Sequence, residues 1–164
     1  MQYSRMNPAS LSRESMAAPS TLRALVIGED AGYRRRAEHV IGEVGSVSFA
    51  LMTPTDPVDV VDLAERERAA VLVLDATGCE AQLIAVVRAL AERMPEVGVV
   101  VVCEHLTDGA RELRALPKWG WMRDLREGVQ RAAIDGNPLG RPRALAANGR
   151  RDLRGVSATR GSRR

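Results

Sequence analysis

The most constraining feature of the sequence is a run of four apolar residues, Val71 to Leu74, that leads directly into Asp75. Because every position is apolar, the run suits a strand that is buried on both faces, as in a parallel sheet covered by helices. Asp75 would then stand at the carboxyl end of that strand, where open α/β sheets place their ligand crevices. Asp is also a favoured N-cap residue, so a helix-capping role is the alternative explanation for this carboxylate.

Further strand-like and helix-like segments surround this run. Apolar or alternating runs predict strands, and apolar residues at steps of three or four predict helices. The predicted strands cover residues 22–28, 47–51, 70–74, 97–102 and 119–122. The predicted helices cover residues 31–44, 58–68, 80–94, 106–116 and 125–136. This (βα)5 order predicts an α/β fold with a five-stranded, parallel, doubly wound sheet of the flavodoxin-like type.

Composition divides the chain into three parts. Residues 1–20 are rich in Ser, Pro, Ala and Met without periodicity, and we expect them to form a disordered leader. Residues 21–136 form the predicted domain. Residues 137–164 carry eight Arg and one Asp and are expected to be a disordered basic tail. Such a tail can contact nucleic-acid backbones weakly, but it supplies no sequence specificity.

The cysteine count and the hydropathy pattern bear on the compartment. Cys79 and Cys103 form neither a disulfide framework nor a zinc-ligand spacing, which fits a reducing environment. No apolar run approaches the roughly 20 residues that a membrane-spanning helix requires. We therefore expect a soluble, cytoplasmic protein that does not insert into a membrane.

Polar side chains follow four of the predicted strands and would meet at one edge of the sheet. Glu29 and Asp30 follow the first strand, Asp75 the third, Cys103 the fourth and Arg123 the fifth. Carboxylates gathered in one crevice repel each other unless a cation joins them, and their oxygens suit Mg²⁺. Two carboxylates can hold the metal while a third, ionised and accessible, attacks phosphorus as a nucleophile.

This arrangement resembles the receiver (CheY-like) domains of two-component response regulators. The resemblance rests on the Glu29-Asp30 pair, on Asp75, and on the Trp121 to Asp124 segment at the predicted fifth strand, and it covers residues 21–136. It implies a signalling protein rather than an enzyme, with Asp75 as phosphoacceptor and Glu29, Asp30 and Asp75 as ligands of Mg²⁺.

The resemblance also implies partners. A histidine kinase would donate the phosphoryl group, and a second copy or an output protein would bind the fourth helix and the fifth strand. No DNA-binding domain is recognisable after the receiver-like part, so specific DNA binding is not expected.

Two residues depart from the family pattern. Cys103 stands where receivers have a Ser or Thr, and Arg123 stands where they have a lysine. Together with Trp121, these residues occupy the expected switch and phosphoryl-contact positions. Lys118, the only lysine of the chain, precedes the predicted fifth strand and so is not expected to replace Arg123. The alternative is therefore a degenerate receiver that acts without phosphorylation as an interaction or dimerisation module, and a small metal-dependent α/β enzyme is the least favoured hypothesis.

Overall fold

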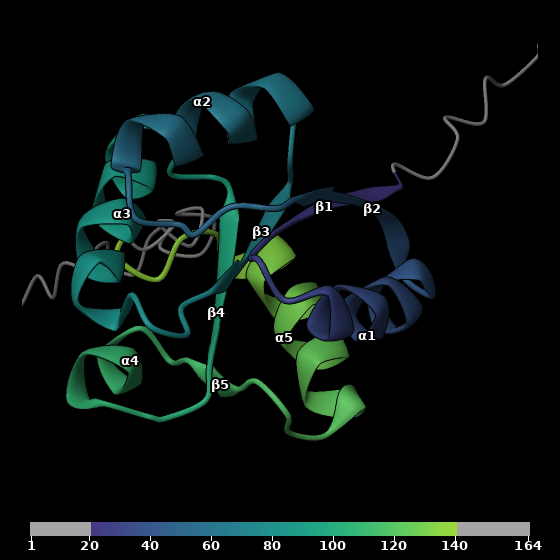
Figure 1. The fold of residues 1–164 in the computed structure, drawn as a ribbon. Helices are drawn as coiled ribbons and strands as arrows, with labels where there is room; N and C mark the ends of the chain where they lie inside the picture. Colours follow the sequence, from purple (N-terminus) through teal and green to yellow (C-terminus); the bar gives the residue numbers. More distant parts are fainter. Residues whose placement is uncertain (1–20, 141–164) are drawn as a thin grey trace, which may run out of the picture.

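Five parallel strands in the order β2-β1-β3-β4-β5 form a single sheet at the centre of the molecule. The computed structural model describes residues 21–140. A helix follows each strand, so the predicted α/β fold with five βα units is confirmed (Figure 1). Within the described part of the chain, no helix is long and apolar enough to cross a membrane. The leader and most of the basic tail lie outside the described residues.

The elements have the following bounds. The strands are β1 (Leu22–Ile27), β2 (Gly45–Ala50), β3 (Val71–Asp75), β4 (Gly98–Cys103) and β5 (Leu116–Pro117). The helices are α1 (Ala31–Gly42), α2 (Pro57–Glu67), α3 (Glu80–Arg93), α4 (Asp108–Glu112) and α5 (Met122–Asp135).

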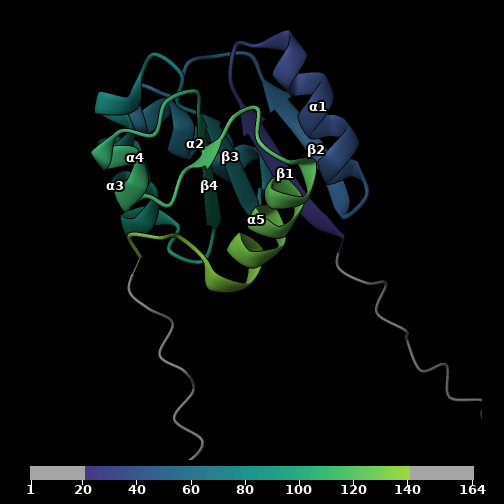
Figure 2. The ribbon, with the colours of Figure 1, turned by 90° about the horizontal axis from the view of Figure 1, so that it is seen from below.

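Helices cover both faces of the sheet, as Figure 2 shows. Helices α1 and α5 pack on one face, where alternate residues of β1, β3 and β4 meet apolar side chains such as Ile41 and Val129. Helices α2, α3 and α4 cover the other face with side chains such as Val61 and Leu90. Every residue of β3 and β4 is buried, because helices cover both faces of these strands and their side chains contribute to both cores.

Local sequence signals set several helix starts. Asp30 and Asp56 have extended backbones, and their carboxylates accept hydrogen bonds from the first free N–H groups of α1 and α2. Pro57 then occupies the first turn of α2, where its missing N–H costs no hydrogen bond.

Two predicted elements near the end of the sheet are wrong in position. Residues 119–122 do not form a strand; the fifth strand is Leu116–Pro117, and Met122 already begins α5. Helix α4 is also only five residues long, which is shorter than predicted. The apolar Trp-rich segment suggested a strand, whereas a two-residue edge strand has no periodicity to reveal it.

The folded part also continues past Gly136, where we had placed the start of the tail. Asn137 is buried, and its side-chain amide donates a hydrogen bond of 3.0 Å to the carbonyl of Val87 on α3. Its own side-chain oxygen accepts from the N–H of Leu139, which packs against the α3 side of the core.

Candidate functional site

Asp75 lies at the carboxyl end of β3, with a side chain that is only 5% exposed. Its Oδ1 accepts hydrogen bonds from the Thr77 hydroxyl at 2.7 Å and from the Thr77 N–H at 3.1 Å. Gly28 makes room for it, because a Cβ at position 28 would lie 2.7 Å from the Asp75 Cβ. The loop after β1 must therefore carry a glycine for the carboxylate to take this position.

Asp30 reaches the same place from the loop after β1. Its Oδ1 caps α1 by accepting from the N–H groups of Gly32 at 2.8 Å and Tyr33 at 3.0 Å. The other carboxylate oxygen, Oδ2, takes no part in this cap and faces the carboxyl ends of the strands. The neighbouring Glu29 is exposed and lines an open pocket at this edge of the sheet together with Asp30 and Asp75.

Lys118 joins the two aspartates. Its ammonium lies 2.9 Å from the Asp30 Oδ2 and 2.9 Å from the Asp75 Oδ2, and its side chain is 3% exposed. The backbone explains this placement: Lys118 directly follows β5, and its N–H donates to the Cys103 carbonyl at 2.8 Å. The lysine therefore emerges at the carboxyl end of β5, level with the ends of β1 and β3.

The ion triad of Asp30, Lys118 and Asp75 shifts the pKa values of Asp30 and Lys118. Burial acts to lower the pKa of Lys118, but the hydrogen bonds and the charges of the two aspartates outweigh it and raise the pKa overall. The hydrogen bond from Lys118 is the main reason that the pKa of Asp30 is lowered, and the α1 N–H groups add to it. Both shifts favour the charged forms, so Asp30 and Lys118 are held in their ionised forms at neutral pH.

Aromatic rings flank the lysine. The Lys118 ammonium lies 5.6 Å from the ring centre of Tyr33 and 5.5 Å from that of Trp119, within the range of cation–π attraction. The two rings meet edge to face with their centres 5.9 Å apart. The Arg36 guanidinium donates to the Gly120 carbonyl and so ties the loop after β5 to α1.

The other residues predicted for the site lie elsewhere or are closed off. Cys103 was expected just after the fourth strand and is the last residue of β4; it is fully buried, and burial raises the pKa of its thiol. Trp121 is 80% exposed at the start of α5 rather than on a strand. Arg123 is exposed in α5, where it pairs with Asp124 and Glu127. The structure therefore does not bring Trp121 or Arg123 to Asp75, because the segment we read as a strand is a loop and a helix start.

The pocket at this edge is lined by residues of four loops and strand ends. These are Glu29, Asp30, Thr53, Asp75, Thr77 and Lys118. The sequence did not lead us to expect Thr53 or Thr77 at the site, and Lys118 was set aside because it precedes the predicted fifth strand. The signal that points to Lys118 is its being the only lysine of the chain, one residue after an apolar Leu-Pro pair.

Two of the three residues predicted to hold Mg²⁺ contact the Lys118 ammonium instead of forming an open set of ligands. The Oδ2 atoms of Asp30 and Asp75 converge on the Lys118 ammonium, and Glu29 is exposed. Within residues 21–140, no three His, Cys, Asp or Glu side chains are grouped so that they could hold a metal ion. The lysine supplies positive charge between the clustered carboxylates.

The chain was compared with known proteins. No protein-family model matches it, and no curated protein matches it in sequence. Its fold, in contrast, is similar to that of many solved structures.

Three of these solved structures are representative. A putative pilus assembly-related protein of Burkholderia pseudomallei has a TM-score of 0.58 at 19% identity, over 70% of this chain and 90% of that one. A CheY-like protein of Pseudomonas aeruginosa, TadZ, has a TM-score of 0.55 at 16% identity, over 68% and 98% of the two chains. The BeF3-activated receiver domain of DrrB, a Thermotoga maritima response regulator, has a TM-score of 0.55 at 20% identity, over 70% and 98%. The predicted resemblance to CheY-like receiver domains is thus confirmed at the level of the fold.

Proposed function

We propose that this protein is a receiver-type signalling module that accepts a phosphoryl group on Asp75. The observation that carries the proposal is the Lys118 ammonium, 2.9 Å from a carboxylate oxygen of Asp75 and held there by Asp30. A fixed cation beside a nucleophilic carboxylate stabilises negative charge on an incoming phosphoryl group. The receiver fold supports the same role.

The chemical step is a phosphoryl transfer from the phosphohistidine of a histidine kinase. An oxygen of Asp75 attacks phosphorus, so that an acyl phosphate P–O bond forms while the P–N bond to the imidazole breaks. The released imidazole takes up a proton from solvent. Lys118 then exchanges one carboxylate partner for phosphoryl oxygens, and Asp30 keeps the ammonium in place through the transfer.

Our proposal makes the chain a cytoplasmic signalling component that relays a phosphoryl group rather than turning over a metabolite. Both cysteines of the described part are buried free thiols, which supports a reducing compartment. Two proteins of similar fold, from Burkholderia pseudomallei and Burkholderia thailandensis, are named as putative pilus assembly proteins, so an assembly partner is one class of output to test.

A specific observation favours the alternative, a module that works without phosphorylation. Both oxygens of Asp75 already have partners, Thr77 on one side and Lys118 on the other, and the side chain is almost completely buried. Cys103 supplies only a weak thiol donor where receivers have a hydroxyl. In this alternative the ion triad only stabilises the fold, by linking the carboxyl ends of β1, β3 and β5.

Incubation with acetyl phosphate followed by intact-mass measurement separates the two functions. We expect a single phosphoryl adduct that disappears in Asp75→Asn and persists in the matched control Asp62→Asn, an exposed aspartate on α2. Parallel reactions with and without Mg²⁺ test whether Glu29, Asp30 and Asp75 rearrange around a metal, as the sequence led us to expect. No adduct under conditions that label an ordinary receiver would assign the chain to the phosphorylation-independent alternative.

Replacing Cys103 with threonine sharpens this result. Cys103 ends β4 next to Lys118 and is buried, so a threonine there would place a hydroxyl where the receiver pattern has one. We expect Cys103→Thr to increase the amount of adduct, with Cys79→Thr as the control that changes the other buried thiol. An unchanged adduct yield would mean that position 103 does not contact the phosphoryl group.

A further inference from the structure

Strand β5 is too short to cover the outer edge of β4. It pairs only with the last two residues of that strand, Val102 and Cys103, whereas β4 begins at Gly98. No described strand lies opposite the first half of β4 on this side. The sheet therefore ends there in an edge that is open to another strand.

The backbone of β4 presents hydrogen-bonding groups to this edge. The N–H of Gly98 donates a hydrogen bond to the carbonyl of Ala70, which precedes β3. The backbone N–H and C=O of Gly98 therefore point toward β3, away from the open edge. Because backbone groups of successive strand residues point to opposite edges, the N–H and C=O of Val99 point outward. An added strand would find a donor and an acceptor at this residue.

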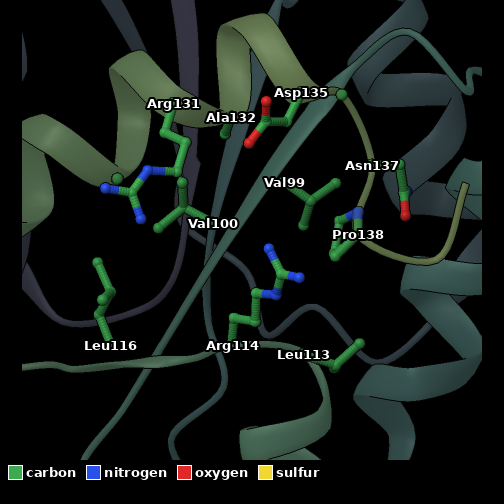
Figure 3. A pocket seen from close by; sticks show the side chains of 12 residues that line it. Val99, Val100, Leu113, Arg114, Leu116, Arg131, Ala132, Asp135, Asn137 and Pro138 are labelled. Atoms are coloured by element: carbon green, nitrogen blue, oxygen red, sulfur yellow. The ribbon is translucent and has the colours of Figure 1, made fainter. Parts of the chain in front are cut away.

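A groove of about 140 Å³ runs beside this edge, between the segment before β5 and the end of α5 (Figure 3). Val99, Val100 and Leu116 contribute apolar side chains to its lining. Gly128 of α5 lets Leu116 pack closely against the helix at the wall of the groove, because a Cβ there would lie 2.9 Å from the Leu116 Cδ1. The groove can thus take apolar side chains of a strand that pairs with β4.

The charged residues at the groove are mainly basic. Arg114 and Arg131 line it from opposite sides and are exposed, and Asp135 is the single acidic residue of the lining. Neither arginine forms an ion pair with another residue in the range 21–140. Two unpaired guanidinium groups beside an apolar groove are complementary to carboxylates that flank an apolar side chain.

We propose that this groove binds an extended segment of a partner protein by strand addition to β4. The segment carries apolar side chains that enter the groove and carboxylates that pair with Arg114 and Arg131. Main-chain hydrogen bonds to Val99 supply affinity, and the two arginines select an acidic segment. This site lies at the outer edge of β4, away from the ion triad at the carboxyl ends of the strands.

The chain's own tail is a poor match for the same groove. The described part of the chain ends at Gly140, two residues after Pro138 of the lining. The sequence beyond Gly140 carries eight Arg and one Asp, so it has the same sign of charge as Arg114 and Arg131. Charge therefore favours an acidic segment from another protein.

The test uses the full-length protein and a hexapeptide that alternates glutamate and valine. Calorimetric titration should show saturable binding, and a hexapeptide with lysine in place of glutamate should bind at least about tenfold more weakly. Arg131→Glu should weaken binding at least about fivefold. The matched control Arg35→Glu, which reverses an exposed arginine on α1, should change the affinity by less than about twofold.

Amide hydrogen exchange measures protection of the Val99 N–H, which charge attraction alone would not change. On saturation with the acidic peptide, exchange at Val99 should slow by at least about tenfold, because strand addition engages its N–H. Absence of binding, equal binding of both peptides, or an unprotected Val99 in the complex would each overturn the proposal. A Val99 amide that is already protected in the free protein would also overturn it, since the tail or a second copy would then occupy the edge.

Discussion

Strands β3 and β5 each place one member of the Asp75–Lys118 ion pair, yet they differ in almost every other respect. All five residues of β3 are buried between two neighbouring strands. Strand β5 is two residues long, half-buried to exposed, and contains a proline that cannot donate a hydrogen bond. A buried, ion-paired side chain can therefore be placed by a strand too short to leave a hydrophobic pattern.

The two strands also fix their charged residues by different means. Asp75 is a residue of β3 itself and is held by packing on both faces of the sheet. Lys118 follows β5, and a hydrogen bond to Cys103, two carboxylates and two aromatic rings hold it. Strand β3 thus supplies rigidity from the core, whereas the position of Lys118 depends on polar contacts.

Removing the lysine should have the largest effect on stability. Lys118→Met leaves the buried Asp75 carboxylate without its cation and should lower the free energy of unfolding by about 4 kcal/mol. The double variant Lys118→Met/Asp75→Asn removes both charges and should recover most of that loss. Urea unfolding at pH 7 measures both. A loss below about 1 kcal/mol would mean that Asp75 is not dependent on Lys118.

Matched leucine truncations should separate the core strand from the edge strand. Leu74→Ala in β3 removes a fully buried side chain and should cost about 3 kcal/mol. Leu116→Ala in β5 truncates a half-buried side chain beside an open groove and should cost about 1 kcal/mol. Equal losses in urea unfolding would contradict the distinction between the two strands.

Acidification should reduce the stabilising contribution of Asp30, the member of the ion triad that follows β1. The pKa of Asp30 is lowered in the folded protein, so its stabilising contribution is present above the ordinary value of 3.8 and is lost as the pH falls through the lower, folded value. The difference in stability between the wild type and Asp30→Asn should therefore shrink in strong acid. Since asparagine also caps helices well, the cap of α1 is preserved in the comparison. A difference that is independent of pH would exclude Asp30 as the titrating group.

The smallest expected effect concerns the alkylation rate of the two buried thiols and involves no change in the free energy of unfolding. Burial raises the pKa of Cys79 to about 11 and also raises the pKa of Cys103, so both remain protonated at pH 7. Alkylation by iodoacetamide should be slow in the folded protein and rapid in urea. Fast alkylation of Cys103 in the folded state would show that the end of β4 opens more readily than that of β3.

The contrast between β3 and β5 also explains what could be read from the sequence. The continuous apolar runs of β3 and β4 predicted buried strands, and the first of them placed Asp75 correctly at the end of β3. The fifth strand could not be recognised because edge residues bear few packing constraints. Trp121 looked like a strand residue, but its ring is largely exposed at the start of α5. Because residues 119–122 were predicted as the fifth strand, Lys118 was left out of the predicted site and Arg123 was assigned to its position.

The most direct test is a ¹⁵N NMR measurement of the Lys118 side chain. Lys118 is the only lysine, so its ammonium gives a single side-chain resonance of this type. We predict a resonance at neutral pH that is protected from solvent exchange, that titrates above the ordinary lysine pKa of 10.5, and that loses protection in Asp75→Asn. A rapidly exchanging ammonium signal that is unaffected by Asp75→Asn would contradict the ion triad and the function proposed for it.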